Sequence, residues 1–164
     1  MLKRRTTDES IEKAFKLIHQ FGIRTTANNM IGFPGEHEED IFETIKLDRR
    51  IQAKSYDLSF VAAYIGIPIH TVTKRLGYLD MWDKPGFKGM VKNISTRRGP
   101  SVRNPHISPE RLIRLFYEFM DYIEGRLPIP DKFTKSAPGS GKNAPPRGEM
   151  GKEVVEAFNS LHSY

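Results

Sequence analysis

Apolar residues recur at spacings of three and four in three stretches of this chain, a pattern typical of amphipathic helices with one buried face. Each stretch also carries helix-end signals. Thr7 and Ser108 suit N-caps, because a hydroxyl oxygen can accept from the free N–H groups of the first turn. Gly22 and Gly125 stand where a helix commonly ends in a left-handed residue. The pattern predicts helices over about residues 8–21, 38–53 and 109–124.

Two strands are predicted between and after the first two helices. Residues 23–31 are rich in β-branched side chains, and residues 58–63 (LSFVAA) are apolar on both faces, as in sheets covered on both sides or in barrels. A shorter helix is expected over 69–76. The order helix, strand, helix, strand is typical of α/β layering with a parallel crossover between the strands.

Proline, glycine and serine mark the less regular parts. Residues 77–104 predict an ordered but irregular connection, which is long for a compact domain. The composition then predicts three parts: a body over 1–125, a flexible linker over 126–151 and a short amphipathic tail over 152–164. The tail is too short to form a stable helix alone, so it would dock on the body or on a partner.

The absence of cysteine from all 164 residues excludes several chemistries. This chain forms no disulfide, no thiolate nucleophile and no cysteine-ligated iron–sulfur cluster. The five histidines include no pair at i,i+3 or i,i+4, so a local metal site is not expected. No apolar run is long enough for a membrane span, and no apolar stretch follows the basic residues 1–5. We therefore expect no membrane partner and a cytoplasmic location.

The formal net charge of +6 is spread rather than concentrated. Lysine and arginine alternate with acids along the predicted helices, as on an ordinary solvated face. Arg97, Arg98 and Arg103 form the one basic patch, and no aromatic residues are interleaved with them. A nucleic-acid partner is therefore not expected.

The most informative local feature is the end of the first predicted strand, residues 28–36 (NNMIGFPGE). Ligands of parallel α/β folds bind beyond the carboxyl ends of the strands. Glycine permits close approach of the backbone to a ligand, and Pro34 stiffens the turn. The same pattern also suits a plain strand-to-helix connector, so physical reasoning alone leaves both interpretations open.

This segment resembles the fifth-strand segment of the radical S-adenosylmethionine (SAM) superfamily, in the branch that often carries a cobalamin-binding domain. Two further segments agree with that family in order and spacing. Residues 2–4 (LKR), followed by Thr6 or Thr7, resemble the start of the preceding helix. Residues 64–68 (YIGIP) stand where the family has a Tyr-Pro-Gly-Thr-Pro turn, although isoleucine replaces its second and fourth residues. The resemblance covers about residues 1–125.

The resemblance implies a part of a SAM pocket at the ends of two strands. Asn28 would point a polar group into the barrel, and the next residues would approach the adenine and ribose, while the backbone after the second strand would contact the adenine edge. The implied SAM-binding residues are Asn28, Met30, Ile31, Gly32, Gly35, Glu36, Val61, Ala62, Ala63 and Tyr64. No residue of this chain is implied to be catalytic or to bind a metal.

The family's three-cysteine CxxxCxxC loop, which holds the [4Fe–4S] cluster that reduces SAM, is absent here. The resemblance therefore implies a C-terminal segment that is inactive alone. It also implies a partner, the N-terminal, cluster-bearing portion of the barrel, encoded in the same gene or as a separate chain. Truncation, a frameshift or a split gene would each produce this arrangement, and the parent protein would in some cases bind cobalamin.

The expected fold is α/β: a partial, half TIM-like barrel of parallel strands and crossover helices, with a C-terminal helix and a flexible tail. A half barrel exposes a sheet edge and apolar faces, so we expect the purified chain to oligomerise or aggregate. Two other hypotheses stay open. In the first, the chain is a non-catalytic module that binds a nucleotide-like ligand or an anionic partner. In the second, it is an unrelated α/β protein.

Overall fold

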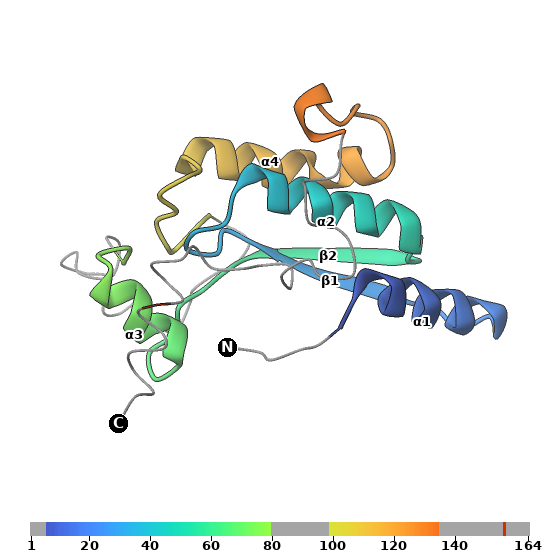
Figure 1. Ribbon diagram of the computed structural model, residues 1–164, viewed down its shortest axis with the longest axis horizontal. Coiled ribbons are helices and arrows are strands. Elements are labelled where there is room, and N and C mark those ends of the chain that lie inside the picture. The colour runs from blue at the N-terminus through green and yellow to red at the C-terminus, as the bar shows by residue number, and fades with distance from the viewer. Residues whose placement is uncertain (1–5, 80–98, 135–155, 157–164) are drawn as a thin grey trace.

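The computed structural model describes residues 6–79, 99–134 and Glu156. Within these residues the fold is mixed α/β, with a parallel two-stranded sheet and four α-helices (Figure 1). The basic patch at Arg97 and Arg98 and nearly all of the predicted tail lie outside the described residues. The elements are α1 (Asp8–Gln20), β1 (Thr26–Ile31), α2 (Glu38–Ile51), β2 (Ser55–Phe60), α3 (Pro68–Arg75), α4 (Pro109–Ile123) and the 3₁₀ helix η2 (Asp131–Phe133).

The sheet is built from a β1–α2–β2 crossover, as the sequence pattern predicts. Thr26 pairs with Ser55 and Ile31 with Phe60, without a bulge between them. Side chains alternate along β1, so Ala27 and Ile31 are buried while Asn28 and Met30 are exposed. Among the described residues, the sheet therefore has one covered face and one open face.

Helices α2 and α4 lie together on the covered face of the sheet (Figure 1). Apolar side chains at helical spacing on both helices meet those of the strands in one core. Arg49 of α2 ties the helices together, because its Nε donates to the carbonyl oxygen of Tyr122 at 2.7 Å, at the end of α4. The core residues are Ile31, Ile41, Phe42, Ile45, Phe60, Ile107, Leu112, Leu115, Phe119, Tyr122, Ile123 and Phe133.

Both strands are displaced from their predicted bounds. β1 begins at Thr26 rather than residue 23, and β2 covers 55–60 rather than 58–63. The apolar run 58–63 was a poor guide because β2 begins with polar residues on the open face, where Thr26 Oγ1 and Ser55 Oγ lie 2.8 Å apart. Val61, Ala62 and Ala63 consequently follow the strand instead of forming its end.

The predicted linker begins later than residue 126. Residues 126–134 pack on the body, and Phe133 is buried with its ring stacked on Phe42 at a centroid distance of 4.3 Å. Leu127 and Ile129 also contact the core. Burial of these apolar side chains offsets the turn-forming composition of the segment. The rest of the predicted linker lies outside the described residues.

Helix α1 has an apolar stripe that the rest of the described chain covers only in part. Ile11 and Phe15 pack against Ala27, Leu47 and Ile51, but no residue of α1 is fully buried. Toward its end, the exposed fractions are 55% for Leu17, 73% for Phe21 and 58% for Ile23. The periodicity therefore predicts the helix correctly and overstates its burial within these residues.

Gln52 ends α2 in the left-handed region, with φ 48° and ψ 49°. A side chain there costs roughly 1 kcal/mol relative to glycine, because Cβ crowds the following carbonyl oxygen. We expect Gln52→Gly to raise the free energy of unfolding by about 0.5–1 kcal/mol, measured by thermal denaturation. Gln20→Gly is the matched control, since Gln20 is helical and its replacement should lower stability. A loss of stability in Gln52→Gly would contradict the prediction.

Candidate functional site

The carboxyl ends of β1 and β2 lie side by side. The Val61 N–H donates to the carbonyl oxygen of Ile31 at 2.9 Å, so the turn after β1 and the segment after β2 start from neighbouring positions. The two stretches singled out in the sequence, 28–36 and 61–64, are thus brought together at the carboxyl ends of the strands. These ends are where parallel α/β folds place their ligands.

The turn after β1 is tightly constrained. Gly32 and Gly35 have φ values of 87° and 82°, which side chains rarely adopt, and Pro34 between them is fully buried. The carboxylate of Glu36 folds back over the turn, where its Oε2 accepts from the Gly32 N–H at 2.6 Å and the Phe33 N–H at 3.2 Å. These bonds use the amides that a ligand at the turn would otherwise reach.

Glu36 is itself buried, with an exposed fraction of 5%. The pKa of its carboxyl is raised from 4.5 to about 7, mainly by burial, and the charge of Asp40 contributes in the same direction. The hydrogen bonds from Gly32 and Phe33 oppose the shift, because they favour the carboxylate. Glu36 therefore changes its protonation state near neutral pH.

Asn104 holds the outside of the same turn. Its Nδ2 donates to the carbonyl oxygens of Phe33 and Glu36 at 2.8 and 2.9 Å, and its Oδ1 accepts from the N–H groups of His106 and Ile107 at 2.7 and 3.0 Å. This amide joins the strand end to the start of α4. Sequence reasoning did not single out Asn104, although an Asn-Pro pair just before a helix N-cap is a known turn signal.

The residues implied by the resemblance separate into two groups by exposure. Six are buried in the core or turn: Ile31, Gly32, Gly35, Glu36, Val61 and Ala63. Asn28, Met30 and Tyr64 are exposed, and Ala62 is half-buried. Exposed fractions of 53% for Met30 and 43% for Tyr64 leave apolar surface open at these strand ends. The exposed residues can meet a ligand directly, whereas the buried ones shape the backbone beneath it.

The open face carries little acid–base chemistry. Asp57 and Ser59 of β2 pair with Asn28 and Met30 of β1, and Thr26 pairs with Ser55, so the polar groups of this face are one carboxylate, one amide and three hydroxyls. Among the described residues, no group of three or more His, Cys, Asp or Glu side chains is arranged to hold a metal ion.

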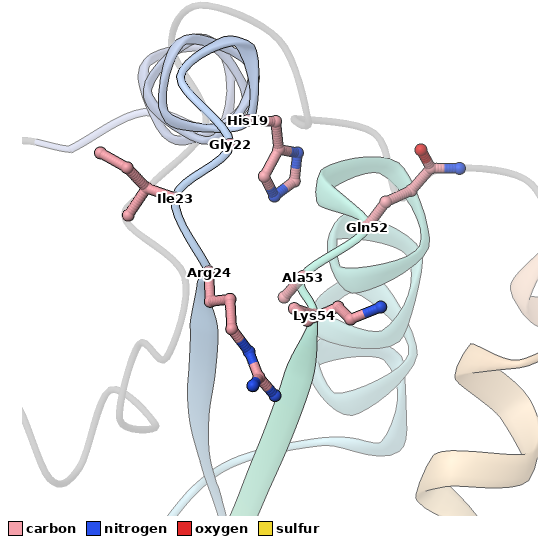
Figure 2. Close-up of a pocket in the computed structure, with 7 residues that line it drawn as sticks. All are labelled: His19, Gly22, Ile23, Arg24, Gln52, Ala53 and Lys54. Carbon is pink, nitrogen blue, oxygen red and sulfur yellow. The ribbon is translucent and has the colours of Figure 1, made fainter.

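A groove of about 520 Å³ lies at the opposite, amino end of the strands (Figure 2). The C-terminal ends of α1 and α2 lead into its walls, and the negative ends of helix dipoles favour nearby cations. Two basic side chains, Arg24 and Lys54, line the groove near these helix ends. It is lined by His19, Gly22, Ile23, Arg24, Gln52, Ala53 and Lys54.

No helix of the described residues is long and apolar enough to cross a membrane. Comparisons with protein-family models, with curated proteins and with solved structures find no match to this chain.

Proposed function

We propose that this chain is the C-terminal part of a radical SAM barrel and forms one wall of its SAM pocket. The two parallel strands and their crossover helix would be the last strands of a half TIM-like barrel, with the open face of the sheet toward its centre. The proposal is supported mainly by the side-by-side strand ends, which carry the IGFPGE turn and the segment 61–64 that resemble the family.

The edges of the sheet also support a partial barrel. Within the described part of the chain, β1 and β2 pair only with each other, so the outer edge of each strand lacks a partner. Strands of a closed barrel have a neighbour on both sides. The exposed Leu17, Phe21 and Ile23 at the end of α1 extend the uncovered surface. The N-terminal, cluster-bearing portion of the barrel is the partner we propose for these edges.

The exposed residues suit an adenosyl group. Met30 and Tyr64 offer apolar surface for the flat adenine ring, and Asn28 offers an amide that can donate to and accept from the ribose. When bound and reduced by the cluster of the missing portion, SAM supplies the radical chemistry. The residues of this chain orient the cofactor, and the buried Gly32, Glu36 and Val61 hold the backbone that carries them.

Complementation tests this proposal. The chain would be mixed under anaerobic, reducing conditions with an N-terminal barrel portion that carries the CxxxCxxC loop, and reductive cleavage of SAM would be measured. We expect cleavage well above that of either portion alone. Met30→Lys should lower it at least tenfold by placing a charge against the adenine. Tyr117→Lys is the matched control, because Tyr117 is 71% exposed on α4 and is not among the residues proposed to meet SAM.

Association of the two portions without any gain in SAM cleavage would contradict the proposal. Calorimetry with SAM and S-adenosylhomocysteine on this chain alone distinguishes the alternative function. Binding that is lost in Met30→Lys, together with no effect of the N-terminal portion, would identify a non-catalytic module that binds a nucleotide-like ligand at the same strand ends.

A further inference from the structure

Two side chains clasp the turn after β1, and only one of them can change its charge. Asn104 holds the carbonyl oxygens of Phe33 and Glu36 from outside, while Oε2 of the Glu36 carboxyl group accepts from the N–H groups of Gly32 and Phe33 from within. Both glycines of the turn have left-handed backbone conformations. The turn therefore has a left-handed glycine on either side of buried Pro34 and is held on its inner side by a titratable group.

The Glu36 carboxyl group has no positively charged partner among the described residues. Only Oε2 of Glu36 accepts hydrogen bonds there, which leaves Oε1 able to carry a proton. Asp40 on α2 repels the carboxylate. Arg111 pairs instead with Glu38 at 2.8 and 3.0 Å. The other charged or titratable groups on the segments that flank the turn include His37, Glu39, Arg103, His106 and Glu110. The His37 and His106 rings stack on each other with 3.9 Å between their centroids.

We propose that the turn over residues 32–36 is a proton-controlled latch, closed while the Glu36 carboxyl carries a proton and loosened when that proton leaves. In the closed state the neutral carboxyl fills a buried site with its Oε2 on two amides. In the loosened state the carboxylate reaches water, and the Gly32 and Phe33 amides lose their acceptor. The proposal needs only the residues of this chain and does not depend on the proposed SAM chemistry.

The direction of the response follows from proton binding. The closed turn raises the pKa of Glu36 to about 7, whereas a carboxyl exposed by opening has its ordinary value of 4.5. The closed state therefore binds more protons between these values, and closure weakens as the pH rises. Two proton-binding equilibria with these constants make opening about tenfold more favourable at pH 8 than at pH 6.

Amide hydrogen exchange of the full chain measures the latch directly. The protection factors of the Gly32 and Phe33 amides, corrected for intrinsic exchange, should fall about tenfold from pH 6 to pH 8. The Arg111 amide, which donates to the Ser108 hydroxyl, is an internal control that should stay constant. In Glu36→Gln the amide oxygen still accepts from the turn but does not titrate, so the fall should disappear. Glu38→Gln should retain it.

Equal protection of Gly32 and Phe33 at pH 6 and pH 8, or the same fall in Glu36→Gln as in the natural chain, would overturn the latch. If Glu36→Gln does not fold, the side-chain carboxyl carbon of Glu36 can be titrated by NMR in the unaltered chain. A midpoint near 7 supports the latch, whereas a midpoint near 4.5 would overturn it.

Discussion

Asn104→Ala is expected to lower the free energy of unfolding by about 4 kcal/mol, because it removes four hydrogen bonds at a buried site, each worth about 1 kcal/mol. The Glu36 carbonyl oxygen and the N–H groups of His106 and Ile107 then lose this partner, while the Phe33 carbonyl oxygen keeps the Glu36 N–H as a donor. Since a domain of this size is stable by roughly 5–15 kcal/mol, the variant should be close to unfolding at 37 °C. Urea denaturation followed by circular dichroism measures the loss.

Asn28→Ala is the matched control for this change. Asn28 is exposed on the open face of the sheet, so its replacement should alter stability by less than about 0.5 kcal/mol. Asn104→Asp separates the two sides of the clasp, since it keeps the acceptor for His106 and Ile107 but lacks donors for Phe33 and Glu36. A loss below about 1 kcal/mol in Asn104→Ala would show that the turn does not depend on this amide.

Gly32→Ala should destabilise the protein by about 2–3 kcal/mol, the second largest effect we expect. An alanine at φ 87° is strained by roughly 1 kcal/mol, and its Cβ would lie 2.9 Å from Leu112 Cδ2. Leu112 is only 1% exposed, so moving it disturbs the core at a further cost of about 1–2 kcal/mol. Chemical denaturation gives the total.

Gly22→Ala distinguishes the strain from the clash. Gly22 also has a left-handed φ, 67°, but nothing lies within 4 Å of its added Cβ, so the expected loss is about 1 kcal/mol. In a double-mutant cycle, Leu112→Ala should relieve part of the Gly32→Ala loss, since it removes the clashing atom. Equal losses in Gly22→Ala and Gly32→Ala, or strict additivity with Leu112→Ala, would contradict the steric explanation.

Local patterns predicted the helices well because caps and apolar spacing act within a few residues. Thr7 and Ser108 accept from Ser10 and Arg111 as expected of N-caps, and Gly22 is left-handed. Strand bounds were less accurate, because a strand with one open face tolerates polar residues that an apolar count rejects. Phe133 shows a similar limitation. The composition of the segment around it predicts a linker, but its ring stacks on Phe42, which is far away in sequence.

At the candidate site, the sequence predicted the strand end and its glycine turn, but not how the turn is held. Glu36 was expected near the turn. Its hydrogen bond with the Gly32 N–H depends on the exact path of the backbone, which composition does not encode. Asn104 lies on a separate segment, and its contact with Phe33 spans 71 residues. Interactions between distant segments need the assembled fold, so neither the clasp nor the pKa of Glu36 follows from local pattern.

The bond from Arg49 to the end of α4 has a consequence for synthesis on the ribosome. Its two partners are 73 residues apart, so α2 and the strands emerge well before the helix that covers them. At 5–20 residues per second, translation leaves an interval of roughly 4–15 s. During that time Phe42, Ile45 and Phe60 lack the side chains of α4. The nascent chain thus exposes apolar side chains that are covered only when α4 arrives.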